Sequence, residues 1–326
     1  MRRNKAGIIL TSVLCFFIIA GLGCSAVSPS APVQKRRVAL VAKSTQTEFW
    51  KSVFAGAEAA AAEYNLELVI SGPETEEDYE AQNQLVRQAV AGGAEALVFS
   101  AIDFENNAST IDAAADAGVK IVTIDSRVTS QYVETYIGTD NYAAGQQAAS
   151  AALESGYEHM YVGLINYDVN SANGQEREKG ARDRLLAAKD VTLVDTINVL
   201  AAADNAMAGT MSMLHDHPEI NVLIAFNEPT AVGAARAVDS LKLYSSIWLV
   251  GFDSNVETVD KLQTGAVDAL IVQNPYAMGY LGVESAYKLI SGKSGTLEPI
   301  VDTSTLTVTL SNMFTVDGQK ALFPFQ

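Results

Sequence analysis

The sequence predicts an α/β protein made of parallel sheets, and three observations carry that prediction. Short runs of Val, Ile, Leu and Ala alternate with Ala-rich stretches whose apolar residues recur at three-to-four spacing. The apolar runs are continuous rather than alternating, which indicates strands buried on both faces. Ten such runs are many for one sheet, and 326 residues suffice for two domains, so two doubly wound domains are the natural division.

Ten strands are expected, separated in most cases by a helix. They span residues 38–42, 66–71, 95–100, 119–125, 132–137, 159–165, 191–198, 220–226, 246–252 and 267–273. Helices are expected in segments such as EFWKSVFAGAEAAAAEYN (48–65) and EPTAVGAARAVDSLK (228–242). This alternation predicts parallel pairing, because parallel neighbours need a crossover connection.

The N-terminal segment has the pattern of an export signal. Three basic residues precede an apolar run from Ile8 to Gly23, as in a basic n-region followed by an h-region. A membrane anchor is the competing interpretation, but the run falls short of the ~20 residues that a bilayer requires. We expect residues 1–23 to be a signal peptide and residues 24–36 to be a flexible tether.

The chain has two cysteines, Cys15 within the apolar run and Cys24 at its end. Cleavage before Cys24 would leave a chain whose single thiol is its first residue, which resembles a bacterial lipoprotein with the lipid on Cys24. One departure is Gly21, which stands where that pattern usually has Leu. A disulfide framework is excluded after Cys24, so the fold must rest on its core.

The formal net charge of −16 argues against a nucleic-acid partner, because an acidic surface repels polyanions. The densest acidic stretch is PETEEDYE (73–80), which we expect to be a solvated loop and helix start.

Patterns typical of catalysis or metal binding are weak. Two of the three histidines, His215 and His217, stand at an expected helix end and lack an obvious third metal ligand, and His159 is distant in the sequence. The GKS at 292–294 lacks the glycine that a phosphate loop needs at position 287, which is Tyr287. Neither G-x-S-x-G nor H-E-x-x-H occurs. We therefore expect that the protein is not an enzyme and that it has neither a cofactor nor a metal site.

Two expected strands end in the same dipeptide, Asp-Ser: IVTIDS (121–126) and LVGFDS (249–254). In open parallel sheets, ligands bind outside the carboxyl ends of the strands, where Asp125 and Asp253 stand. The alternative at the second strand is a helix start, because Ser254–Glu257 fits a capping box. That alternative explains the serine without explaining Asp253.

The two dipeptides also belong to a short internal repeat. Asp125 follows Ser100, the end of ALVFS, by 25 residues, and Asp253 follows Asn227, the end of LIAFN, by 26. Two similar units that face one another would place all four strand ends along a shared crevice.

With these motifs, the sequence resembles the ribose/galactose-type periplasmic binding proteins, the substrate-capturing subunits of bacterial ABC importers. The resemblance runs from about Val38 to Thr309. Its motifs occur in the family's order: VALVAKSTQTEFW, ALVFSAID, IVTIDSR, IGTDNYAAG, GQEREKGARD, LIAFNEPTAVGAARAV, LVGFDS and VDALIVQNPYAMGYLGVES.

The resemblance implies two Rossmann-like lobes with parallel sheets, joined by a three-strand hinge as in the type I periplasmic-binding-protein fold. The crossings would fall near Gly138–Asn141, Val272–Asn274 and Asp302–Ser304. The implied lobes are discontinuous: residues 37–139 plus 274–302 form the N-terminal lobe, and residues 140–273 plus 303–326 the C-terminal lobe.

The resemblance also implies which residues hold the ligand. They are Lys43, Thr47, Phe49, Trp50, Ser100, Asp125, Arg177, Asn227, Phe252, Asp253 and Gln273. The carboxylates would accept hydrogen bonds from sugar hydroxyls, the amides and Arg177 would add donors, and the aromatic rings would pack on the flat C–H faces of the sugar.

Each role has a competing structural explanation. Phe49, Trp50 and Phe252 could be ordinary core residues. Arg177 could form a surface ion pair with a neighbouring glutamate. Gln273, before Asn-Pro, could belong to a turn.

Three implied positions, Lys43, Thr47 and Ser100, depart from the family's usual residues, which are a small polar residue at the first and Asn at the other two. Together with Arg127 and Arg177, Lys43 suggests the hypothesis of an anionic sugar.

The expected function is that of an exported, monomeric solute-binding protein that a lipid tethers to the cell membrane, facing the periplasm or the cell exterior. It would capture a monosaccharide or related polyol and deliver it to an ABC permease. The alternative is the ligand-binding component of a chemotaxis or sensor-kinase system, which uses the same fold. A sugar-responsive transcription regulator is set aside, because residues 1–36 provide a signal and tether instead of a helix-turn-helix. A hydrolase remains a distant alternative.

Overall fold

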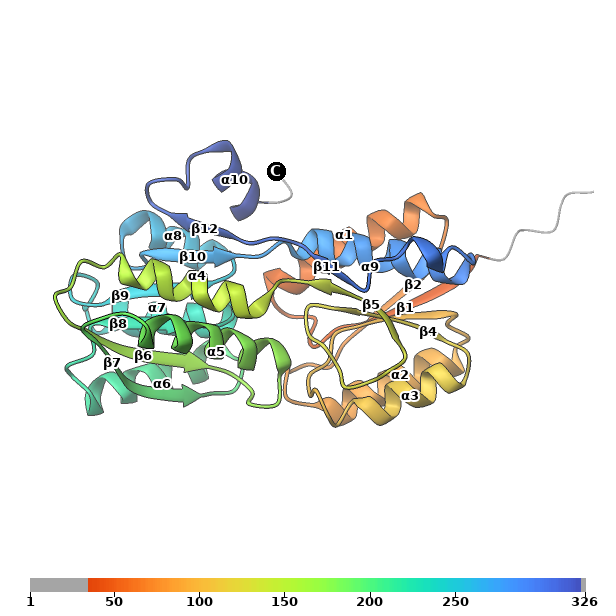
Figure 1. Ribbon diagram of the computed structural model, residues 1–326, viewed down its shortest axis with the longest axis horizontal. Helices are drawn as coiled ribbons and strands as arrows, with labels where there is room; N and C mark the ends of the chain where they lie inside the picture. Colours follow the sequence, from red (N-terminus) through yellow and green to blue (C-terminus); the bar gives the residue numbers. More distant parts are fainter. Residues whose placement is uncertain (1–34, 324–326) are drawn as a thin grey trace, which may run out of the picture. The chain divides into compact units, whose positions relative to one another are not determined.

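The computed structural model describes residues 35–323 and contains two six-stranded sheets, each with helices on both faces (Figure 1). The predicted signal peptide (1–23), Cys24 and residues 25–34 of the predicted tether lie outside the described residues. None of the helices in residues 35–323 is long and apolar enough to cross a bilayer.

The first sheet has the strand order β11-β5-β4-β3-β1-β2. Its strands are β1 (Arg37–Val41), β2 (Glu67–Ser71), β3 (Ala96–Phe99), β4 (Lys120–Ile124), β5 (Val133–Gly138) and β11 (Ile300–Asp302). One face packs against α1 (Glu48–Glu63) and α9 (Pro275–Ile290), and the other against α2 (Tyr79–Ala91) and α3 (Ala108–Asp116) (Figure 1). A short 3₁₀ turn, η1 (Ser294–Thr296), follows α9. We call this sheet and its helices the first lobe.

The second sheet repeats that plan with the order β12-β10-β9-β8-β6-β7. Its strands are β6 (Met160–Asn166), β7 (Val191–Asn198), β8 (Val222–Ala225), β9 (Trp248–Phe252), β10 (Ala269–Val272) and β12 (Leu306–Thr309). One face packs against α4 (Asn141–Leu153) and α5 (Ala172–Leu186). The other packs against α6 (Ala203–Asp216), α7 (Glu228–Ser240), α8 (Val256–Thr264) and the short α10 (Val316–Leu322). We call this sheet and its helices the second lobe.

The predicted α/β architecture is confirmed, and all ten predicted strands are present within two residues of their expected limits. Two further strands, β11 and β12, were not predicted. They are only three and four residues long and partly exposed, so they give no continuous apolar run. The expectation of purely parallel sheets is wrong at one edge, because β12 pairs with β10 in the antiparallel sense.

The chain passes between the two sheets three times. It leaves the first sheet after β5 and enters α4, returns from β10 into α9, and leaves again from β11 into β12. Side chains on two of these passages reach each other, because Thr139 Oγ1 donates to Gln273 Oε1 over 2.9 Å.

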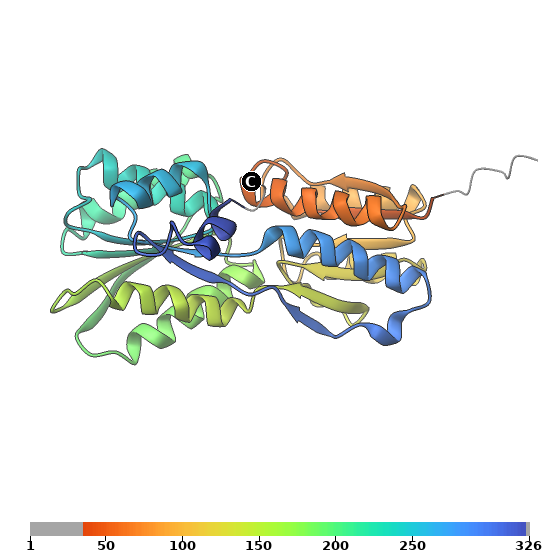
Figure 2. The same ribbon diagram turned by 90° about the horizontal axis from the view of Figure 1, so that it is seen from above.

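Each lobe contains helices that pack closely at glycines, and one such pair, α1 and α9, lies side by side in Figure 2. A Cβ added at Gly279 would lie 1.9 Å from the carbonyl oxygen of Val53, and one at Gly56 would lie 2.0 Å from that of Tyr276. Both distances are far inside van der Waals contact, so these helix backbones touch directly.

The second lobe has the same arrangement between α4 and α5. A Cβ at Gly145 would lie 2.0 Å from the carbonyl oxygen of Arg177, and one at Gly180 would lie 2.1 Å from that of Tyr142. The α4–α5 contact therefore fixes the backbone of one of the predicted site residues.

Candidate functional site

Polar side chains gather where the strands of both sheets end. Ser100 and Asp125 directly follow β3 and β4, and Lys43 stands two residues after β1. In the second sheet, Asp253 and Gln273 directly follow β9 and β10. These are the positions at which open parallel sheets bind ligands.

A small cavity between the lobes brings most of these residues together. Nine of the eleven predicted residues line it: Lys43, Thr47, Phe49, Trp50, Asp125, Arg177, Asn227, Asp253 and Gln273. The other two, Ser100 and Phe252, are buried but lie outside the lining. The cavity volume is about 20 Å³, enough for roughly one water molecule, so side chains of the protein fill most of the site.

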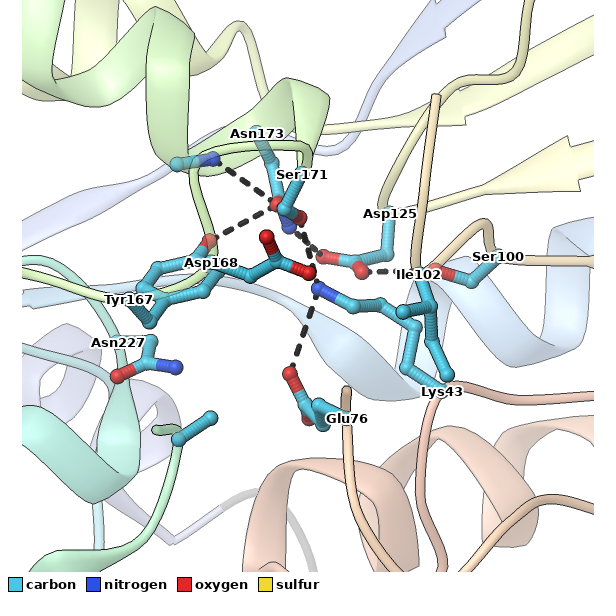
Figure 3. A network of polar contacts seen from close by, with 12 residues as sticks. Lys43, Glu76, Ser100, Ile102, Asp125, Tyr167, Asp168, Ser171, Asn173 and Asn227 are labelled. Atoms are coloured by element: carbon cyan, nitrogen blue, oxygen red, sulfur yellow. Dashed lines mark hydrogen bonds and ion pairs between the residues drawn. The ribbon is translucent and has the colours of Figure 1, made fainter. Parts of the chain in front are cut away.

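Asp125 is held by polar partners from both lobes (Figure 3). Its Oδ2 accepts a hydrogen bond from Ser100 Oγ over 2.9 Å, and its Oδ1 accepts one from Asn173 Nδ2 of the second lobe over 3.1 Å. Burial raises the pKa of Asp125, while the charges of Lys43 and Arg177 act in the opposite direction.

Asp253 has the corresponding position in the second lobe and the same unusual backbone. Its φ is 65° and that of Asp125 is 56°, in the left-handed region that non-glycine residues seldom adopt and that often marks functional sites. Asp253 Oδ1 accepts a hydrogen bond from Gln273 Nε2 over 2.7 Å. Burial raises the pKa of Asp253 from its ordinary 3.8 to about 7, despite the nearby Arg177.

This shift predicts a pH-dependent difference between the wild type and Asp253→Asn. Between pH 4 and 7 the folded protein holds a proton on Asp253 that the unfolded chain has released, so stability from this group is lost as pH rises to about 7. We expect the melting temperature of the Asp253→Asn variant to rise relative to the wild type between pH 4 and pH 8. Paired thermal melts measure this difference, and a flat one would contradict the buried, proton-binding carboxyl.

Arg177 is completely buried and satisfied by neutral acceptors. Its Nε donates to Asn141 Oδ1, its Nη1 to the carbonyl oxygen of Phe226 and its Nη2 to Gln273 Oε1, each over 2.8 Å. The guanidinium carbon lies 4.6 Å from the ring centre of Phe252. The alternative of a surface ion pair is excluded, because the side chain is 1% exposed and points into the lobe interface.

Lys43 reaches across the interface from the first lobe (Figure 3). Its Nζ lies 3.3 Å from Glu76 Oε2 and 3.0 Å from Ser171 Oγ of the second lobe. The ammonium also lies 5.1 Å from the ring centre of Tyr167. Burial lowers the pKa of Lys43, but Glu76 and its other neighbours raise it by more, so the side chain is a buried cation with an acidic partner.

Glu228 connects the lobes in the opposite direction. Its Oε2 accepts a hydrogen bond from the backbone N–H of Phe49 over 2.9 Å, and its Oε1 accepts one from that of Glu48 over 3.3 Å. Asn255 Nδ2 also donates to Oε1, over 2.9 Å. A carboxylate of the second lobe thus occupies the positive N-terminal end of α1 in the first lobe.

The aromatic residues divide into two groups. Phe49 and Trp50 line the cavity and also belong to the core of the first lobe, with their ring centres 5.1 Å apart. Trp50 Nε1 donates to Glu76 Oε1 over 2.8 Å. Phe252 lies behind Arg177, with its ring centre 6.1 Å from that of Phe226, so it supports the guanidinium from outside the cavity.

Helix capping accounts for part of the polar pattern. Asn227 caps α7 in a box with Thr230, which uses its amide oxygen and leaves the Nδ2 donor for the cavity. The proposed capping box that begins at Ser254 is wrong, because Asn255 caps α8 and Thr258 closes the box. The helix begins one residue later than expected, and Asp253 takes no part in the cap.

The lining of the cavity contains more carboxyl groups than cationic side chains. Lys43 and Arg177 are opposed by four carboxyl groups, those of Glu76, Asp125, Glu228 and Asp253. Arg127 does not join them: its guanidinium carbon lies 4.4 Å from the ring centre of Tyr136, and it is absent from the lining. The geometry therefore gives no support to the hypothesis of an anionic sugar.

Sequence reasoning missed five lining residues: Glu76, Tyr167, Asn173, Glu228 and Pro229. The expectation of a solvated loop and helix start at 73–80 is wrong for Glu76, whose side chain is 11% exposed. Tyr167 directly follows β6, so the strand-end rule applied to that strand would have found it.

Among residues 35–323, no group of three or more His, Cys, Asp and Glu side chains could hold a metal ion.

Comparison with known proteins places this geometry in a family. Residues 38–294 match the family model described as a periplasmic binding protein domain. The chain is 30% identical over 305 residues to a D-ribose/D-allose-binding protein of Pseudomonas aeruginosa. This match covers 90% of the chain and 92% of that protein. It is 25% identical over 282 residues to the ribose import binding protein RbsB of Escherichia coli, covering 85% and 92% respectively.

Solved structures agree. A carbohydrate transporter solute-binding protein from Agrobacterium radiobacter, in complex with D-arabinose, superposes with a TM-score of 0.86 at 27% identity, covering 89% of this chain and 99% of that one. An ABC transporter solute-binding protein from Agrobacterium vitis with bound D-fucose gives a TM-score of 0.85 at 25% identity, covering 88% and 100%. The matches span both lobes, and on these grounds the chain belongs to the periplasmic binding protein family, whose members bind solutes rather than transform them.

Proposed function

We propose that this protein captures a monosaccharide or related polyol between its two lobes and delivers it to an ABC import permease. The observation that carries the proposal is the pair of buried carboxylates, Asp125 and Asp253, which end equivalent strands of two sheets and line one cavity. Carboxylates in a desolvated site are strong acceptors for sugar hydroxyls. The relatives named above bind or import sugars, which supports the same class of ligand.

The charge balance of the cavity favours a neutral sugar. Each cation already has polar partners, Lys43 with Glu76 and Arg177 with Asn141 and Gln273. An additional carboxylate on the ligand would meet the four carboxyl groups of the lining.

A thermal-shift panel tests the proposal directly, because a ligand that binds only the folded state raises the melting temperature. The panel contains D-ribose, D-allose, D-arabinose, D-fucose, D-tagatose, xylitol and D-galacturonate. We expect at least one neutral member to raise the melting temperature and to be recovered unchanged, and D-galacturonate to have no effect. A panel without any hit would refute sugar capture, and conversion of the sugar would refute the binding-protein assignment.

Three further parts of the proposal concern the organisation of the chain. We propose that the lobe limits are 37–139 with 274–302 and 140–273 with 303–326, that Cys24 carries a lipid after removal of residues 1–23, and that the mature protein is a monomer. Mass spectrometry of the exported protein tests the lipid. A Cys24→Ser variant that stays in the membrane fraction would contradict it.

Loss of the Glu228 carboxylate is expected to speed release of the ligand. In Glu228→Gln one of the two acceptor atoms becomes a donor, and hydrogen bonds to charged groups contribute about 1.5–3 kcal/mol each, so we expect the dissociation rate to rise roughly 10-fold. The association rate should change little, because the contact forms after the lobes close. Stopped-flow fluorescence of Trp50, which lines the cavity, measures both rates.

The matched control is Glu48→Gln. The backbone N–H of Glu48 donates to Glu228, but its side chain is 50% exposed and pairs with Lys51 instead. Equal effects of the two substitutions would show that Glu228 has no specific role in holding the lobes together.

A further inference from the structure

A second and much larger cavity adjoins the small one. Its volume is about 570 Å³, within the range of roughly 300–1,000 Å³ of small-molecule pockets. Three residues line both cavities, Phe49, Asp253 and Gln273, and the side chains of the last two are joined by the 2.7 Å hydrogen bond. The boundary between the cavities therefore consists of side chains and includes one of the two carboxylates proposed to hold the sugar.

The wall of the large cavity comes from both lobes and has an apolar side. It is built from the start of α1, the starts of α8 and α9, the passage into β12, and α10. Val272, Leu306, Leu322 and Phe323 line it. Such a wall suits a ring with an apolar face, whereas the small cavity offers mostly polar and charged groups.

One polar group on this wall is unsatisfied. Ser52 of α1 lines the large cavity and is 3% exposed, yet its hydroxyl makes no hydrogen bond with any residue in 35–323. Buried hydroxyls almost always have a partner, because leaving one unpaired costs about 1–3 kcal/mol. The hydroxyl oxygen exposes less than 1 Å², so it would serve a ligand group as donor and acceptor once the adjoining side chains of the wall move aside.

The geometry points to a two-part ligand: we propose that the large cavity binds the second ring of a glycoside whose sugar ring lies between Asp125 and Asp253. The second ring would lie against Val272, Leu306 and Leu322 and offer a polar substituent to Ser52. This inference rests on the proposed function, since it takes the sugar site as given. It extends the cargo from a free monosaccharide to a sugar carrying a ring on its anomeric oxygen.

The test compares free sugars, their methyl glycosides and their 4-nitrophenyl glycosides by calorimetry on the whole protein. For the sugar that binds best, we expect the nitrophenyl glycoside to bind at least as tightly as the free sugar. Two variants narrow the large cavity without touching the small one: Ala321→Trp on α10, and Val256→Trp at a rim position that is 77% exposed. Each variant should lower the affinity for the nitrophenyl glycoside at least 10-fold and leave the affinity for the free sugar within twofold of the wild type.

Val316→Trp is the matched control, because it adds the same ring to α10 at a position that is 69% exposed and outside the lining. It should leave the affinities for both ligands unchanged. The inference is overturned if free sugars bind but the nitrophenyl glycosides do not, or if both narrowing variants bind the glycoside like the wild type. If neither free sugars nor glycosides bind, the proposed function falls as well, so the two failures are distinguishable.

Discussion

Replacing Asp253 by Ala is expected to weaken sugar binding by a factor on the order of 100 or more. A sugar hydroxyl bonded to this carboxylate gains a charge-assisted contact worth about 1.5–3 kcal/mol, and the truncation also leaves Gln273 Nε2 without its acceptor at 2.7 Å. Asp125→Ala should have an effect of similar size, because it occupies the equivalent strand end in the first lobe. Isothermal titration with the best sugar of the panel measures both losses, at pH 8 because the pKa of Asp253 is about 7 and its carboxyl is then ionised.

The control for this prediction is Asp268→Asn. Asp268 is also a partly buried carboxyl whose pKa burial raises, to about 6, but it precedes β10 at the amino end of the strand and bonds to the backbone N–H of Leu249. Its replacement should leave affinity unchanged. Unaltered affinity in both the Asp125 and the Asp253 variants would refute the site, whereas equal losses in all three would indicate a general loss of folding.

Substitution of Gly279 by Ala is expected to produce the largest loss of stability. The added Cβ would lie 1.9 Å from the carbonyl oxygen of Val53 and 3.0 Å from the backbone nitrogen of Ala57, so α1 and α9 would have to separate. Forced overpacking of this kind costs typically 1–3 kcal/mol and sometimes more, and a clash between two helix backbones belongs at the upper end. We expect the melting temperature to fall on the order of 10 °C.

Gly295→Ala is the matched control, since a Cβ there meets no heavy atom within 4 Å. Thermal unfolding should show it within about 1 °C of the wild type. If Gly279→Ala melted at the same temperature, the direct backbone contact between the two helices would be wrong.

The strand pattern and the strand-end rule were enough to predict the sheets and much of the candidate site. Continuous apolar runs identify strands buried on both faces, and the residue after such a run stands at the ligand edge of the sheet, as Asp125 and Asp253 do. β12 escaped prediction because it is only four residues long and, apart from the buried Val308, partly exposed, which is too short a run to show a pattern. β12 pairs with β10 in the antiparallel direction because the chain enters it from the first lobe. The local sequence does not encode that path of the chain.

The missed acidic residues show a different limit. Glu228 stands in the first turn of α7, where an acid is ordinary helix chemistry, and its partner Phe49 is 179 residues away. Glu76 lies among other acids, and only the approach of Lys43 and Trp50 makes it part of the site. Their roles depend on contacts distant in sequence, so composition and spacing alone could not reveal them.

The contact between Gly145 and the carbonyl oxygen of Arg177 has a consequence for anyone who wishes to retune this protein as a biosensor. The backbone of Arg177 packs too closely against α4 to shift. Substitutions on α4 or α5 would therefore displace the Arg177 side chain before they altered ligand selectivity. Lys43 and Thr47, by contrast, stand on the connection between β1 and α1, outside any such crossing. Libraries that vary this connection are the sensible starting point for a new analyte.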